Sequence, residues 1–220
     1  MPFKVAAIQF SPSKGDVPGN LDRIAGLAKK ASSEGADLCV FPESAVAGYV
    51  LEGGASENSL APDELLFELT KRLDGLGLTI DLLVGFYEKN SGQPYNSAAY
   101  VQIGGDGSRL IHVYRKFFLP TYGVFDEERF HTKGREIGVF DTRLGRFGVL
   151  ICEDVWHSVL ATLCAVNGAE VLLVPSASPV RGFADEKPGN VLRYERMLRG
   201  LSEEHGMFSV AAMLTGFEGG

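Results

Sequence analysis

Cys152 closes an apolar run at 146–151 and opens the polar segment 152–157. The run predicts a buried strand, and the apolar residues beyond the polar segment predict a helix. A thiol at such a turn is held by a rigid sheet, and the dipole of a following helix N-terminus favours its thiolate. The pattern indicates a nucleophile, although a free cysteine can equally serve as a small core residue.

Two charged side chains also follow apolar strands. Glu43 comes after Pro42, which ends strand pairing, and a carboxylate partly withdrawn from water there suits a general base. Lys116 follows an apolar strand among aromatic residues, where an ammonium can hold a developing oxyanion. Glu127, further along, could orient that lysine or a substrate. The alternatives are an exposed glutamate for Glu43, a lysine that packs its stem for Lys116, and an acidic surface loop for Glu127.

Other chemistries find less support in the sequence. A cluster of Cys152, Glu153, Asp154 and His157 matches no familiar zinc spacing, so no metal is expected. The glycines at 104–107 indicate a turn and not a phosphate loop. The remaining cysteines stand in apolar patterns typical of core positions, and they are Cys39 and Cys164.

Composition limits the possible partners. The 220 residues carry a formal net charge of -7, and an acidic protein does not attract nucleic acid or an anionic membrane surface. No apolar run approaches the roughly 20 residues of a spanning helix, and no signal pattern opens the chain. The three cysteines are an odd number and show no pairing motif, so the sequence does not indicate a disulfide framework and favours a cytoplasmic protein.

The apolar periodicity alternates between strand and helix. Strands are expected at 4–10, 37–41, 79–87, 97–103, 109–114, 146–151, 170–174 and 208–214. Helices are expected from an N-cap at Asn20, from Pro62, and at 159–166 and 191–204. The pattern predicts a mixed α/β sheet system with helices packed outside, in a single domain over residues 1–220.

The segments 35–43 and 168–176 share one pattern: a glycine that stops a helix, an apolar strand, a proline and a polar residue. They predict two similar strands whose C-terminal ends deliver polar groups to one place, as ligand sites in open α/β sheets require. Chance similarity of two buried strands is the alternative.

Together these pieces resemble a known family. Glu43 in Phe-Pro-Glu, Lys116 in Tyr-Arg-Lys and Cys152 in Ile-Cys-Glu-Asp occur in the order of the Glu-Lys-Cys triad of the nitrilase superfamily of carbon–nitrogen hydrolases. Within that superfamily, segments 119–127 and 152–156 are similar to the glutaminase domain of glutamine-dependent NAD synthetases. The resemblance implies an α-β-β-α sandwich that commonly pairs through its helices, hence a homo-oligomer.

The resemblance also implies roles. Glu43 is the base, Cys152 the nucleophile, Lys116 the oxyanion stabiliser and Glu127 a supporting glutamate; no cofactor is needed. Family members usually continue further, so this chain is expected to lack C-terminal strands of the full domain. Candidate substrate-binding residues are Tyr49, Tyr122, Glu153, Trp156, Ser176 and Ser178. Arg181 could bind a substrate carboxylate or stand in a solvated loop.

Four functions remain open at this point. The leading hypothesis is a stand-alone hydrolase of a small carboxamide that releases ammonia through a cysteine thioester. The second is a glutaminase subunit that supplies ammonia to an NAD-synthetase-type partner. Nitrile hydrolysis is a third, and an inactive scaffold of the same fold is the fourth.

Overall fold

The computed structural model describes residues 2–50, 54–75, 77–123, 125–179 and 189–216, and within them the chain forms two β-sheets. The first sheet has the strand order β1-β2-β3-β4-β5. Its strands are β1 (Val5–Ala7), β2 (Leu38–Val40), β3 (Ile80–Glu88), β4 (Tyr95–Ile103) and β5 (Arg109–Arg115). The first three run parallel, and β3, β4 and β5 pair antiparallel.

The second sheet has the order β6-β7-β8-β9, with β7, β8 and β9 parallel. Its strands are β6 (Val139–Thr142), β7 (Gly145–Val149), β8 (Val171–Ser176) and β9 (Phe208–Met213). The helices are α1 (Val17–Ser33), α2 (Pro62–Leu73), α3 (Glu127–Phe130), the 3₁₀ helix η1 (Cys152–Trp156), α4 (Ser158–Val166) and α5 (Gly189–His205).

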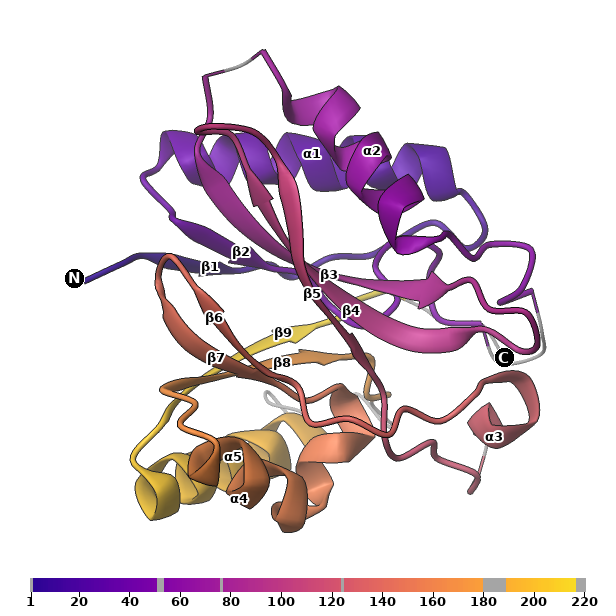
Figure 1. Cartoon of the computed structure of the whole chain (residues 1–220). Helices are drawn as coiled ribbons and strands as arrows, with labels where there is room; N and C mark the ends of the chain where they lie inside the picture. The colour runs from indigo at the N-terminus through magenta and orange to yellow at the C-terminus, as the bar shows by residue number, and fades with distance from the viewer. Residues whose placement is uncertain (1, 51–53, 76, 124, 180–188, 217–220) are drawn as a thin grey trace.

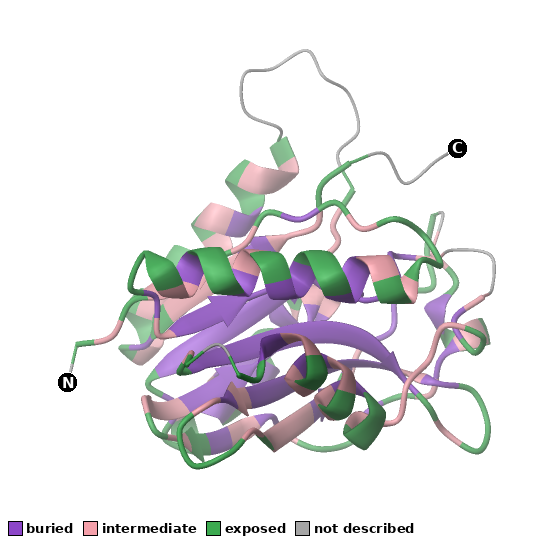
Figure 2. Cartoon of the chain, turned by 90° about the horizontal axis from the view of Figure 1, so that it is seen from above, coloured by how far each residue is buried: buried purple, intermediate pink, exposed green. Residues whose placement is uncertain are grey.

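The two sheets face each other between two layers of helices (Figure 1). One apolar cluster, which includes Leu83 of β3 and Leu172 of β8, joins the facing surfaces of the sheets. A second cluster packs Ile24 of α1 and Leu69 of α2 against the outer face of the first sheet. Helices α4 and α5 cover the other sheet, and Figure 2 shows the strands buried beneath exposed helix faces. The predicted α-β-β-α sandwich is confirmed.

Most of the predicted elements are present. The hairpin around 104–107 joins β4 and β5 as expected. The structure adds β6, which pairs antiparallel with β7 and which the periodicity did not reveal because its four residues form neither an apolar run nor an apolar–polar alternation. Across the described ranges, no helix is long and apolar enough to cross a membrane.

The predicted start of the first helix is wrong. Helix α1 begins at Val17, and the side chain of Asp16 caps it by accepting from the Gly19 amide. Pro18 explains the earlier start, because proline is preorganised for the first turn of a helix. Asn20 is buried inside the helix, where its amide donates to the carbonyls of Ser13 and Val46.

The two similar segments at 35–43 and 168–176 occupy equivalent places. They contain β2 and β8, each lying between two strands of its own sheet with parallel neighbours on the β1 and β9 sides. Their C-terminal ends meet, because the amide of Ala177 donates to the carboxylate of Glu43 over 2.8 Å. The expectation that the ends of these two strands meet is therefore confirmed, although the second strand contributes the backbone amide of Ala177 and not the side chain of Ser176.

The backbone around Glu43 lies directly against β3. A Cβ atom added to Gly85 of β3 would stand 2.4 Å from the Pro42 carbonyl oxygen and 2.8 Å from the Glu43 Cα. These are backbone atoms, so they cannot be relieved by a side-chain rotation. Gly85 thus permits the close approach that places Glu43.

Gly85→Ala is expected to lower the free energy of unfolding by about 1–3 kcal/mol, since the added methyl group forces the two segments apart. Urea denaturation measures the change. Gly26→Ala is the matched control: Gly26 lies in α1 with open space around its Cβ position, so alanine there should stabilise by about 0.5–1 kcal/mol. An unfolding free energy for Gly85→Ala equal to that of the wild type would contradict the close-approach argument.

Candidate active site

A buried lysine lies between two buried carboxylates. The Lys116 Nζ stands 2.7 Å from Glu43 Oε1 and 2.8 Å from Glu127 Oε1. All three side chains are removed from water, with exposed fractions of 1%, 0% and 4% for Lys116, Glu43 and Glu127. Sequence reasoning selected these residues separately, and the fold brings them into one ion triad.

Each member of the triad comes from a different element. Glu43 follows β2, Lys116 follows β5, and Glu127 opens α3. The Asn96 amide of β4 donates to Glu43 Oε1 at 2.8 Å, and the Tyr49 hydroxyl donates to Glu127 Oε1. These donors fix both carboxylates, so the position of the ammonium is determined from two sides.

Charge balance explains the protonation of the triad. Burial alone would lower the pKa of Lys116, but the carboxylates of Glu127 and Glu43 outweigh it and raise that pKa well above its ordinary value. Lys116 therefore stays an ammonium. Burial, and after it the charge of Glu43, raises the pKa of Glu127, while Lys116 opposes the rise. Two carboxylates around one cation leave this cluster rich in negative charge.

Cys152 begins η1 in a left-handed backbone conformation, with φ of 47°. A non-glycine residue pays about 1–2 kcal/mol to hold such a conformation, so the surrounding structure must impose it. The half-buried thiol lies 3.4 Å from the Tyr194 hydroxyl of α5. Burial and the charge of Glu43 raise the pKa of Cys152, and Lys116 counteracts them only in part.

The net shift of the Cys152 pKa is thus opposite to the one expected from a helix dipole. The helix after the strand is a 3₁₀ turn of only five residues, and α4 starts later at Ser158. Desolvation, which a sequence pattern does not display, is the largest cause of the raised Cys152 pKa. The resting group is a thiol beside a carboxylate.

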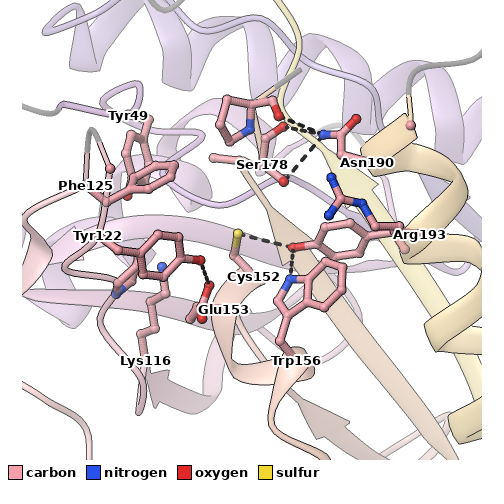
Figure 3. Close-up of a pocket in the computed structure, with 16 residues that line it drawn as sticks. Tyr49, Lys116, Tyr122, Phe125, Cys152, Glu153, Trp156, Ser178, Asn190 and Arg193 are labelled. Carbon is pink, nitrogen blue, oxygen red and sulfur yellow. Dashed lines mark hydrogen bonds between the residues drawn. The ribbon is translucent and has the colours of Figure 1, made fainter. Parts of the chain in front are cut away.

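Cys152 and Lys116 line a cavity of about 530 Å³ (Figure 3). Among the predicted substrate-binding residues, five line it: Tyr49, Tyr122, Glu153, Trp156 and Ser178. The Tyr122 hydroxyl donates to Glu153 at 2.7 Å, and the Trp156 Nε1 donates to Tyr194 at 3.2 Å. Five of the sixteen described residues that line the cavity are aromatic, and oriented polar groups stand among them, as is common in small-molecule sites.

One predicted substrate-binding residue does not line the cavity. Ser176 is fully buried at the end of β8, and the residues that follow it, Ala177, Ser178 and Pro179, line the cavity instead. Arg181 lies outside the described residues.

Sequence reasoning missed several residues of the site. Asn190, Arg193 and Tyr194 line the cavity from the first turns of α5. Asn190 donates to the carbonyl of Pro179 at 2.9 Å, and Figure 3 shows Arg193 beside the cavity across from Tyr122. Their helix was predicted, but its periodicity carries no sign of which face meets η1. The sequence did offer a sign of Asn96, which follows a tyrosine at the start of β4. That strand pairs with β5, which ends directly before Lys116.

The sequence profile described as carbon-nitrogen hydrolase matches residues 4–219. The chain belongs to the carbon–nitrogen hydrolase family. It is 36% identical over 180 residues to a glutamine-dependent NAD(+) synthetase of Acinetobacter baylyi. The aligned region covers 80% of this chain and 32% of that protein. This carbon–nitrogen hydrolase chain thus spans about a third of the length of that relative.

Solved structures agree with the fold of this carbon–nitrogen hydrolase. The glutamine-dependent NAD+ synthetase of Acinetobacter baumannii superposes with a TM-score of 0.81 at 32% identity, over 97% of this chain and 38% of the other. An amidase from Nesterenkonia superposes with a TM-score of 0.76 at 24% identity, over 99% of this chain and 78% of the other. The second likeness bears on the fold alone.

Glu43→Gln is expected to lower the pH at which Cys152 becomes reactive, because the neutral amide no longer repels the thiolate and Lys116 still attracts it. The measurement is the pH dependence of alkylation by iodoacetamide, followed at Cys152 by peptide mass spectrometry. Glu128→Gln is the control, since Glu128 is an exposed neighbour paired with Lys133. A midpoint that moves to higher pH in Glu43→Gln would contradict the electrostatic account.

Proposed function

We propose that this chain hydrolyses the C–N bond of a small carboxamide through a thioester on Cys152 and releases ammonia. The observation that carries the proposal is the buried contact of Lys116 with Glu43 and Glu127 at the floor of the cavity that Cys152 lines. A lysine held between two carboxylates is costly to bury, and a cationic site for a developing oxyanion is a function that accounts for it.

The first half of the reaction forms the thioester. The Cys152 sulfur attacks the amide carbon while Glu43 takes the thiol proton. The carbonyl oxygen becomes an oxyanion, which Lys116 and the backbone N–H after Cys152 stabilise; such a donor supplies about 2.7–4 kcal/mol in other enzymes. Glu43 then gives its proton to the departing nitrogen, the C–N bond breaks, and ammonia leaves.

The second half frees the acid. Water loses a proton to Glu43 and attacks the thioester carbon, and the same donors hold the second oxyanion. The C–S bond breaks, the sulfur recovers a proton from Glu43, and the carboxylic acid departs. The raised pKa of Cys152 suits this sequence, because the thiol keeps its proton until Glu43 removes it in the attack.

A glutaminase activity is the second candidate. Its support is the pair of opposite charges at the cavity, Arg193 from α5 and Glu153 from η1, which stand on either side of Cys152 in Figure 3. These charges suit the carboxylate and the ammonium of an amino-acid amide. The likeness to glutamine-dependent NAD synthetases points the same way, and the ammonia would then pass to a synthetase-type partner. A cytoplasmic location and self-association through the outer helices remain predictions.

Cys152→Ala is expected to lower kcat for amide hydrolysis at least about 10⁴-fold, because it removes the sulfur that carries the acyl group. Ammonia release from a panel of small amides measures it. Cys164→Ala is the matched control, since Cys164 is a buried thiol in the core of α4 and should leave kcat unchanged. Equal rates for Cys152→Ala and the wild type would reject the thioester route.

Arg193→Gln separates the two substrate classes. If Arg193 binds a carboxylate, its loss raises KM for glutamine about 10–100-fold, as expected for a charged hydrogen-bonded pair, and leaves KM for propionamide unchanged. Arg196→Gln is the control, since Arg196 is an exposed arginine of the same helix that is not among the residues lining the Cys152 cavity. An unchanged KM for glutamine in Arg193→Gln would contradict the amino-acid amide assignment.

A further inference from the structure

Asp154 is a fully buried aspartate that the mechanism above does not use. Its carboxylate accepts hydrogen bonds from four donors, one of which, the Phe117 amide, reaches both oxygens. The amides of Phe117 and Phe118 donate to Oδ1 at 3.1 and 2.7 Å. The amide of Ile151 and the hydroxyl of Tyr114 donate to Oδ2 at 3.1 and 2.9 Å. One side chain therefore gathers donors from two distant parts of the chain.

These donors flank the proposed catalytic groups. Phe117 and Phe118 directly follow Lys116, at the end of β5 in the first sheet. Ile151 directly precedes Cys152, where β7 of the second sheet passes into η1. The two catalytic residues belong to different sheets, and Asp154 bonds to the backbone beside each of them.

The contact with Ile151 also closes the turn that contains Cys152. The Asp154 amide donates to the Ile151 carbonyl at 3.0 Å, while its carboxylate takes the Ile151 amide. This reciprocal pair of hydrogen bonds encloses Cys152, whose φ is 47°. Strained backbone persists only where neighbouring bonds impose it, and this pair imposes it here.

We propose that Asp154 is a positioning residue that sets the separation between the Lys116 ammonium and the oxyanion donor at the Cys152 turn. The proposal rests on the oxyanion role given to Lys116 above. The carboxylate acts through the backbone and touches no substrate. Oδ1 holds the lysine segment through the Phe118 amide, and Oδ2 holds the cysteine turn through the Ile151 amide while it also accepts from Tyr114 of β5.

Asp154→Asn should release one of these attachments while keeping the volume of the side chain. If the amide nitrogen replaces Oδ2, it meets the Ile151 amide, donor against donor, and only the Tyr114 hydroxyl can turn to accept. If it replaces Oδ1, it meets both phenylalanine amides. In either orientation the segment of Lys116 and the turn of Cys152 lose their common anchor.

Two small reagents of similar size read this loss at Cys152. Once the Cys152 thiol has lost its proton to Glu43, the sulfur forms an S–C bond at the β-carbon of acrylamide, and the π-electron pair moves to an enolate whose charge lies on the amide oxygen; a proton then returns to the α-carbon. Iodoacetamide loses iodide without building that charge. The ratio of the two alkylation rates therefore reports the oxyanion donors, whereas a general loosening of the fold alters both rates alike.

We expect Asp154→Asn to lower the ratio of acrylamide to iodoacetamide rates at least about tenfold, and to reduce kcat for amides with little change in KM. Two controls test a merely structural role. Tyr114→Phe removes one donor to Asp154 but no backbone contact beside Lys116 or Cys152. Asp81→Asn alters another buried aspartate, bonded to Tyr100 and Arg143 at the start of β3. Both controls should keep the wild-type ratio.

A wild-type ratio in Asp154→Asn would overturn the proposal, and so would an equal fall of the ratio in Asp81→Asn. If the wild type hydrolyses no amide in the panel, the proposed function fails, and the reagent ratio still decides the role of Asp154. If Asp154→Asn does not fold, hydrogen exchange in the wild type decides. The Phe118 amide lies outside any strand, and its bond to Asp154 should protect it as strongly as the amides within β4; exchange at loop rates would overturn the proposal.

Discussion

The position of one ammonium group governs this structure. Lys116 is held away from water between Glu43 and Glu127, at the place where strands of both sheets end. Removing a partner from a buried ion pair costs about 3–5 kcal/mol, because a charge is then left without compensation. The triad is therefore poorly tolerant of displacement, and the segments that carry it must be placed by the rest of the fold.

The sandwich supplies that placement through repetition and close packing. Strands β2 and β8 occupy equivalent positions in the two sheets, and the amide after β8 completes the hydrogen bonds of the carboxylate after β2. A glycine in β3 admits the backbone of Glu43. A left-handed turn then lifts Cys152 toward the cavity beside Lys116. Stability and reactivity thus depend on the same few contacts between the sheets.

Much of this arrangement could be predicted from local pattern. Glu43 and Lys116 directly follow apolar strands, and strand ends in α/β folds collect polar groups, so their convergence was a reasonable expectation. Cys152 was placed correctly after its strand, but its ionisation was not. The pKa of a thiol depends on desolvation and on charges that only the folded chain brings near, here Glu43 across 109 positions of sequence.

Other features depend on contacts without a local signal. Tyr194 resembles any apolar-face aromatic of a helix, and only the packing of α5 on η1 brings its hydroxyl to Cys152. Asp154 resembles a polar residue of a loop, and the four donors that converge on it come from β5, its flanking loop and the Cys152 turn. Such convergence is a property of tertiary structure, so sequence periodicity cannot display it.

The most direct test of the account weighs the covalent intermediate. Wild-type protein mixed with a hydrolysed amide and quenched in acid within the first turnovers should gain the mass of the acyl group, and peptide mapping should place that mass on Cys152 alone. Hydrolysis that proceeds with no acyl group on Cys152, or with the acyl group on another residue, would contradict the central claim that Glu43, Lys116 and Cys152 act as one reactive unit.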